Sequence, residues 1–237
     1  MVIVLTESIT YLKNSDDVWK TSIIGGILLL FGFLLIPLFI VWGYVIQVLA
    51  RTAHGDDEPP RFENWSGLTV DGAKAFVILL AYGLVPLAIG GVLFTSILAA
   101  TGGSPGSIGI AGLLLAGLLT FITMVAAAYT VPAGLANFAD TRRIGSGFDL
   151  DTIRPTLRTG TYATGWLLAF GIVLVGSFVA GILASIPFLG AILGAIVTFY
   201  ALVAAYYVIG QTWEELSPVR LEEREQDDDL STERPAV

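Results

Sequence analysis

The sequence predicts an all-α protein: a polytopic membrane helix bundle with about five transmembrane helices and a short N-terminal interfacial helix. Composition predicts the class, since 55% of the 237 residues are hydrophobic and only 14% are charged, against about 25% charged in a soluble domain. Charge placement predicts the number of spans. No Asp, Glu, Lys or Arg lies in 21–50, 75–139 or 159–213. Roughly 20 helical residues cross the hydrocarbon, so the first stretch holds one span and the others two each.

The N-terminal segment, residues 1–20, is predicted to lie in the membrane interface. Leu5, Ile9 and Leu12 recur at helical spacing and are flanked by charged residues. This amphipathic pattern is typical of a helix that lies along the bilayer surface.

The first span is expected at about 21–50, as one helix kinked at Pro37. The alternative is a hairpin of two half-helices. Each half would hold about 14 residues, too few to cross the hydrocarbon. We therefore expect a single span here.

The remaining elements follow from the other two charge-free stretches. Further spans are expected at about 75–98, 110–138, 161–185 and 188–212, with polar loops at 51–74 and 139–158, which makes 21–212 the transmembrane bundle. The rest, 213–237, is predicted to be a disordered tail, because nine of the 20 acidic residues lie in the last 24 positions. The two loops and their flanking prolines also suggest a span–loop–span repeat, with chance likeness between membrane helices as the alternative.

The basic residues predict the orientation. Ten of the twelve Lys and Arg residues lie in the two polar loops and the tail. Five spans place these segments on one side, which the positive-inside rule assigns to the cytoplasm of a plasma membrane protein. The N-terminus would then lie outside. A first segment that does not cross fully would reverse that end.

Several kinds of site are disfavoured by missing residues. The chain has no cysteine and one histidine, His54, so neither a His or Cys metal cluster nor a Ser-His-Asp triad can form within it. No ionisable residue lies within the predicted spans, where transporters and pumps often keep one. The acidic run 56–58 lacks the ligand spacing of a calcium loop. The net charge of −8 argues against nucleic acid as a partner. We therefore expect no catalytic residue, metal or cofactor, and no enzyme activity.

Two groups of residues remain as candidate sites. One is a set of basic residues in the second polar loop that contact anionic lipid head groups or merely determine orientation: Arg142, Arg143, Arg154 and Arg158. The other is a face of small residues that permits close helix packing, within the chain or in a homo-oligomer: Gly176, Ala180, Ala184, Gly190 and Gly194.

Several short motifs resemble those of a known family. They are Asn14-Ser15-Asp16-Asp17, Trp19-Lys20-Thr21, Ile24-Gly25-Gly26, Pro37, Gly43-Tyr44, Trp65, Leu68, Asp71-Gly72, Lys74-Ala75-Phe76, Val131-Pro132 and Ile186-Pro187-Phe188-Leu189-Gly190. Over roughly residues 5–212 the chain resembles an archaeal, mostly haloarchaeal, integral membrane family that is catalogued as domain of unknown function number four thousand and thirteen. The resemblance implies a membrane helix bundle from an archaeon, often a halophile. It implies no substrate and no catalytic residue.

Two functions fit these observations. The first is a non-enzymatic membrane protein that organises membrane lipids, other membrane proteins or further copies of itself. The uncharged core and the faces of small residues favour it. The alternative is a transporter or permease for an apolar or zwitterionic small molecule, which the helix-breaking prolines favour. A polar cavity at mid-membrane would distinguish the second from the first.

Overall fold

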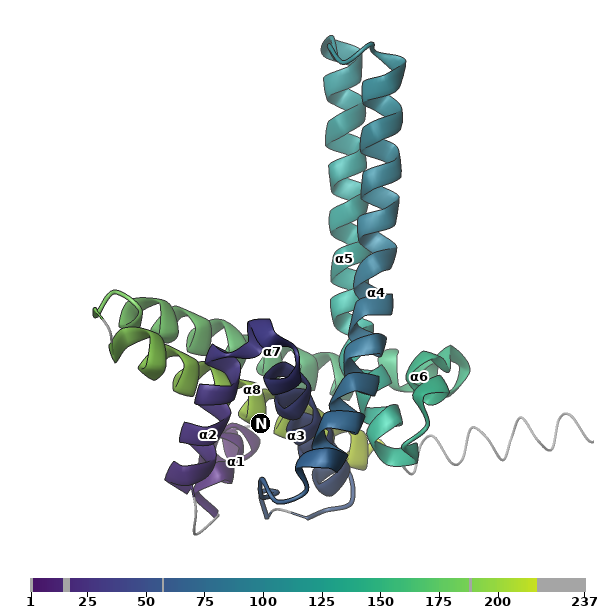
Figure 1. Ribbon diagram of the computed structural model, residues 1–237. Coiled ribbons are helices and arrows are strands. Elements are labelled where there is room, and N and C mark those ends of the chain that lie inside the picture. Colours follow the sequence, from purple (N-terminus) through teal and green to yellow (C-terminus); the bar gives the residue numbers. More distant parts are fainter. Residues whose placement is uncertain (1, 15–17, 57, 188, 217–237) are drawn as a thin grey trace, which may run out of the picture.

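The computed structural model describes residues 2–14, 18–56, 58–187 and 189–216, with the backbone alone for 2–5, 13 and 14. The regular structure in these ranges is entirely helical, which confirms the all-α class. Most of it forms three helical hairpins (Figure 1). They are α2–α3 (Val18–Leu30 and Ile36–Thr52), α4–α5 (Trp65–Ala100 and Ser107–Thr141) and α7–α8 (Gly160–Leu183 and Leu189–Glu215). The predicted tail lies beyond the described residues from position 217 onward.

Four helices are long and apolar enough to cross a membrane, namely α4, α5, α7 and α8. Their most apolar 18-residue stretches have mean hydropathies of 2.2–2.4. All four lie over spans that the charge-free stretches predict. The predicted membrane helix bundle is therefore confirmed, with four long helices and a shorter hairpin in place of five long helices.

The prediction of one continuous helix over 21–50 is wrong. The helix α2 ends at Leu30, a short 3-10 turn η2 (Gly32–Leu34) follows, and α3 begins at Ile36. Leu35 adopts a positive φ of 63°, which an L-residue other than glycine rarely does. Pro37 lies in the first turn of α3, where its missing N–H costs no hydrogen bond. Proline thus starts a second helix here instead of kinking a single one.

The predicted loop over 51–74 is too long, because α4 begins at Trp65. The Asn64 side chain caps the helix by accepting a hydrogen bond from the Gly67 N–H at 2.9 Å. The first turns of α4 pack on α3 so closely that backbone atoms of the two helices are in contact. A Cβ on Gly72 would overlap the carbonyl oxygen of Phe39. At 36 residues, α4 is about 54 Å long.

The core lies where α8 crosses the other elements. Phe199, Val203 and Tyr207 of α8 pack with the fully buried Tyr44 of α3. The short N-terminal helix α1 (Val2–Thr10) and the 3-10 turn η1 (Tyr11–Asn14) lie against α8. Tyr11 is fully buried and its ring lies 4.3 Å from that of Tyr207. The N-terminal segment is thus packed against α8 through its own last residues. The amphipathic pattern alone does not predict this packing.

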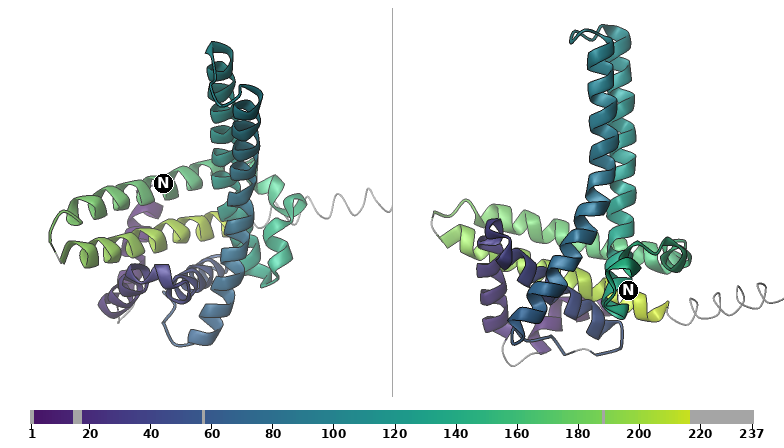
Figure 2. Two further views of the ribbon diagram at one scale, coloured as in Figure 1. Left: turned by 45° about the horizontal axis from the view of Figure 1, so that its top comes forward. Right: turned by 45° about the vertical axis from the view of Figure 1, so that its right-hand side comes forward.

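The α4–α5 and α7–α8 hairpins project from this core in clearly different directions (Figures 1 and 2). The helix α7 joins α5 through hydrogen bonds at their ends nearest the core. Tyr162 donates to the Tyr129 carbonyl at 2.8 Å, and Trp166 donates to the Ala128 carbonyl at 3.0 Å. Beyond this junction no other described segment lies against α4 and α5 along most of their length (Figure 2).

The two polar loops, which the sequence suggested as copies, differ in structure. The described part of the first, between Ala53 and Asn64, contains no helix. The second contains the 3-10 turn η3 (Ile144–Phe148) and the short helix α6 (Leu150–Leu157). Pro37 begins α3, whereas Pro132 lies inside α5. These differences give the proposed repeat no structural support.

Candidate functional site

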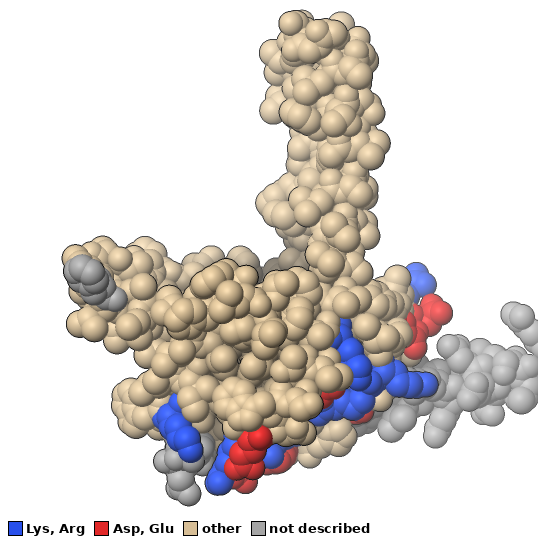
Figure 3. Space-filling model, in the orientation of Figure 1, with Lys and Arg blue, Asp and Glu red and all other residues tan. Residues whose placement is uncertain are grey.

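The charged residues gather at the end of the molecule where the hairpins begin and finish. In the view of Figure 3 they line the lower edge of the body, and the projecting part of the α4–α5 hairpin, residues 75–139, is free of charge to its tip. We call this region the charged base, made of residues 51–64, 71–74, 140–158 and 214–215. No charged residue occurs in α7, or in α8 before Glu214.

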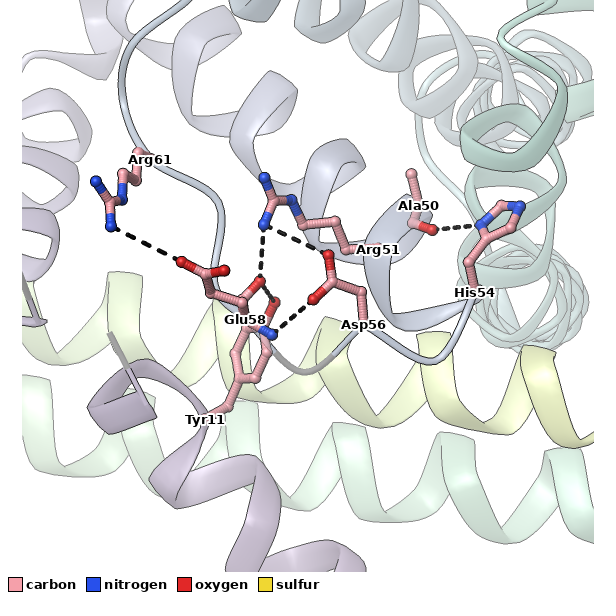
Figure 4. Close-up of polar contacts among 7 residues, drawn as sticks. All are labelled: Tyr11, Ala50, Arg51, His54, Asp56, Glu58 and Arg61. Carbon is pink, nitrogen blue, oxygen red and sulfur yellow. Dashed lines mark hydrogen bonds and ion pairs between the residues drawn. The ribbon is translucent and has the colours of Figure 1, made fainter. Parts of the chain in front are cut away.

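The first loop of the charged base is folded around the Glu58 carbonyl (Figure 4). Arg51 donates to this oxygen at 3.2 Å and forms an ion pair with Asp56 at 3.5 Å. Tyr11, which precedes α2, donates its hydroxyl proton to the same Glu58 carbonyl oxygen at 3.4 Å. Arg61 pairs with the Glu58 carboxylate at 3.8 Å. The chain before α2 and the chain after α3 are thereby joined.

The same acidic residues serve the loop itself. Asp56 also accepts from the Glu58 N–H at 2.9 Å, while Asp57 lies outside the described residues. Nowhere in the described ranges do three or more His, Cys, Asp or Glu side chains come together as metal ligands would. The acidic run 56–58 therefore functions, as far as it is described, in holding the α3–α4 connection.

His54 links the end of α3 to the end of α5. Its Nδ1 lies 2.6 Å from the Ala50 carbonyl oxygen and therefore carries a proton, because a carbonyl only accepts. Its Nε2 lies 3.6 Å from Asp140. Both side chains reach solvent, so the contact is a surface connection between two helices.

The second loop is held to α4 and α5 by an ion pair and a buried hydrogen-bond network. Arg142 ends α5 with a φ of 58° and pairs with Asp71 of α4 at 2.7 Å. Asn137, almost fully buried, donates to the Ser146 carbonyl at 2.8 Å. Tyr82 of α4 donates to the Gly147 carbonyl at 3.0 Å. Local spacing gives no sign of these partners, which lie 9–71 positions apart.

The four predicted arginines are therefore not equivalent. Arg142 is engaged by Asp71. Arg143, Arg154 and Arg158 are exposed, and none of the ion pairs described for the chain includes them.

The predicted face of small residues lies between α7 and α8. A Cβ on Gly176 would overlap Ala201, and one on Gly190 would overlap the Leu183 carbonyl. One on Gly194 would lie 3.1 Å from the Ala180 carbonyl oxygen. Ala184 caps the end of α7 and also lies against Gly190. The geometry places these residues at a contact within one chain.

Several threonine hydroxyls within the long helices bond to the backbone of their own helix. Thr95, Thr120, Thr123 and Thr198 each donate to the carbonyl four residues earlier, at 2.7–3.1 Å. A groove of about 600 Å³ runs along α7 and α8 beside Ile9. Apart from Tyr200, its lining side chains are apolar.

A comparison with protein-family models matches residues 27–185 to the family described as "Protein of unknown function (DUF4013)". The chain belongs to the DUF4013 family. The match covers two thirds of the chain, from the second half of α2 to the turn after α7. No curated protein and no solved structure matches the chain.

The family match stops before the helix that organises the core of this DUF4013 protein. The matched region contains the α4–α5 hairpin and both loops of the charged base, while α8 and most of α2 lie outside it. In α8, 44% of the most apolar stretch is buried. The resemblance in sequence motifs, which extends to about residue 212, is thus confirmed over 27–185.

Proposed function

We propose that this DUF4013 protein is a non-enzymatic scaffold that uses the α4–α5 hairpin to bind membrane-embedded partners. One observation carries the proposal. The described part of the chain covers almost none of this hairpin: only 11% of the most apolar stretch of α4 and 6% of that of α5 are buried. In the α7–α8 hairpin the corresponding stretch of α7 is also 6% buried, but 44% of that of α8 is buried. No described segment packs on the outer part of the hairpin (Figure 1).

The surface of the hairpin favours helices over lipid alone. Gly83 and Gly91 of α4 and Gly117 of α5 have open space where a side chain would be. Small residues allow helix backbones to approach closely, and close packing is a main source of helix association in lipid. Leu87 lies between Gly83 and Gly91 on the same helix face and is 66% exposed.

The non-enzymatic role is supported by the use already made of the polar groups. The hydroxyls of Thr95, Thr120 and Thr198 bond to the backbone of their own helices. The carboxylates Asp56, Glu58 and Asp71 pair with arginines of the same chain. General acid–base catalysis needs such groups free to face a substrate.

Cross-linking tests the scaffold directly, because the chain has no cysteine of its own. Leu87→Cys on α4 and Leu174→Cys on α7 place one thiol each on an exposed apolar helix face. In native membranes, a short bifunctional maleimide is expected to join Leu87→Cys to a second copy or to another membrane protein. Leu174→Cys is the matched control. Equal adducts at both positions, or recovery of the bare monomer alone in mild detergent, would contradict the proposal.

A second candidate function is transport of an apolar small molecule, which the groove along α7 and α8 favours. Gly171 lines this groove with open space beside it, so Gly171→Trp is expected to fill it. If the groove carries the solute, inverted membrane vesicles with this variant take up less of a hydrophobic dye than vesicles with the unmodified protein. Uptake by inverted vesicles corresponds to efflux from the cell. Unchanged efflux, or no efflux by the unmodified protein, speaks against transport.

We infer that the charged base lies in the cytoplasm of a plasma membrane protein. Support comes from the basic residues, since Arg51, Arg61, Lys74 and the four arginines of the second loop all lie there. An origin in a salt-loving archaeon is supported by the net charge of −8 and by the nine arginines against three lysines. The measurement is the salt dependence of folding, and this origin predicts that the folded state requires molar salt.

A further inference from the structure

The connection between α5 and α7 exposes arginine and apolar side chains together. We call it the α6 surface, formed by the following residues: Arg143, Ile144, Phe148, Leu150, Arg154 and Arg158. The three apolar members are 39–54% exposed. The three arginines are exposed and take part in no ion pair among the described residues. Such a surface is costly in water and favourable where water meets lipid.

The α6 helix presents part of this surface on one flank. Ile153 and Thr156 are buried and turn the opposite flank toward the body. Leu150, Arg154 and Arg158 are spaced by four residues, so they follow one another along one side of the helix. The apolar side chain and the two cations therefore face the same environment.

The acidic residues nearby leave the segment positively charged. Asp149 caps α6 by accepting from the Thr152 N–H at 3.2 Å and its hydroxyl at 2.8 Å. Asp151 lies in the first turn of α6, where the helix dipole favours it. Arg142 is paired with Asp71. Across 142–158 there are four arginines and two aspartates, and three of the arginines have no acidic partner among the described residues.

The position of the segment fixes its level relative to the bilayer. It begins one residue after α5 ends at Thr141 and finishes just before α7 starts at Gly160. Both helices are long and apolar enough to cross a membrane, and 75–139 and 159–213 carry no charge. A short segment between two spanning helices lies at the boundary between hydrocarbon and water.

From this combination we propose that the α6 surface binds the phosphate head groups of anionic phospholipids. Arg143, Arg154 and Arg158 contact the phosphates, since a guanidinium donates two parallel hydrogen bonds to phosphate oxygens. Ile144, Phe148 and Leu150 enter the region between head groups and acyl chains. Arg142 takes no part, because its guanidinium is held by the Asp71 carboxylate at 2.7 Å. The proposal is independent of any partner bound by the α4–α5 hairpin.

The test uses the full chain in a neutral maltoside detergent, at the lowest salt concentration at which circular dichroism shows the chain folded. Dioctanoyl phosphatidylglycerol and dioctanoyl phosphatidylcholine are titrated separately, and bound lipid is counted by native mass spectrometry. The unmodified protein is expected to prefer phosphatidylglycerol. Each arginine replaced by glutamine weakens that binding about fivefold, so R143Q/R154Q/R158Q loses roughly a hundredfold. The zwitterionic lipid binds all variants alike.

Arg142→Gln is the matched control. It removes one positive charge from the same loop and is expected to keep the preference for phosphatidylglycerol. Far-UV circular dichroism and the elution volume establish that each variant folds. If the triple variant does not fold, the three single variants are compared with Arg142→Gln instead.

Three outcomes would overturn the proposal. They are an unmodified protein without preference for the anionic lipid, a triple variant that retains the preference, and an Arg142→Gln variant that loses as much as the other single variants. Inorganic phosphate is added in a separate arm. Displacement of phosphatidylglycerol by millimolar phosphate would assign the arginines to a free anion and overturn the assignment to lipid.

Discussion

At the residue scale, the α3–α4 crossing depends on two glycines. A Cβ on Gly43 would overlap the Leu68 carbonyl of α4, and one on Gly72 would overlap the Phe39 carbonyl of α3. Backbone atoms cannot move aside as a flexible side chain can. Each helix therefore lies against the other at a distance that only glycine permits.

We predict that Gly72→Ala destabilises the protein by about 1–3 kcal/mol, because the overpacked helices must separate. This is the net loss that remains after the gain of about 1 kcal/mol that alanine brings as a better helix former. Thermal unfolding in detergent, followed by circular dichroism, measures it. Gly181→Ala on α7 is the control, since open space surrounds that position, and it should be neutral or stabilising. Equal melting temperatures for the two variants would show that the crossing tolerates a side chain.

Sequence reasoning reached some of these residues and missed others for a physical reason. Gly190 and Gly194 stand four apart on one helix, so spacing alone marks a face of small residues. Gly43 and Gly72 each stand singly on different helices, and their meeting is visible only in three dimensions. Likewise Arg142 differs from its neighbours only through Asp71, which lies 71 positions earlier.

At the element scale, the break between α2 and α3 concentrates strain at one residue. Leu35 has a φ of 63° and a ψ of −49°, outside the conformations that L-residues favour. Such a residue costs about 1–3 kcal/mol, and glycine adopts a positive φ without that cost. The break thus carries strain that its own sequence does not relieve.

We predict that Leu35→Gly keeps or raises the thermal stability, by up to about 1 kcal/mol. Leu34→Gly is the matched control. Leu34 is exposed to a similar extent and lies in η2 without a positive φ. Glycine there only adds backbone entropy to the unfolded chain, so this variant should melt lower. If both variants lose the same stability, Leu35 is not strained.

The same break shows where hydropathy stops being informative. Long charge-free stretches located α4, α5, α7 and α8, because a spanning helix must be free of charge over its length. Within 21–50 every residue is uncharged on both sides of the break, so charge gives no signal there. A proline in a charge-free stretch is compatible with a kinked helix and with the first turn of a new one, and Pro37 lies in such a first turn. The eight-residue α6 was missed because its charges and short length are also those of a loop.

At the scale of the whole molecule, the α2–α3 hairpin changes how the ends of the chain are related. Tyr11, before α2, bonds to the Glu58 carbonyl after α3 at 3.4 Å. The two helices have 13 and 17 residues, about 20 and 26 Å, each shorter than the hydrocarbon. We therefore expect the hairpin to enter and leave the membrane at the charged base. The α4–α5 and α7–α8 hairpins also begin and end near this base (Figures 1 and 2).

Three hairpins that all return to one side place the N-terminus beside the charged base, whereas five spans would place it on the opposite side. The absence of cysteine from the chain makes the test direct. Glu7→Cys marks the N-terminal helix, Glu63→Cys the base and Ser104→Cys the exposed tip of α4–α5. With the base in the cytoplasm, a membrane-impermeant maleimide should label only Ser104→Cys in intact cells, and the other two after lysis. Labelling of Glu7→Cys together with Ser104→Cys in intact cells would mean that the 21–50 segment crosses the membrane once after all. Agreement between Glu7→Cys and Glu63→Cys, whichever side they occupy, is what the bond from Tyr11 to Glu58 requires.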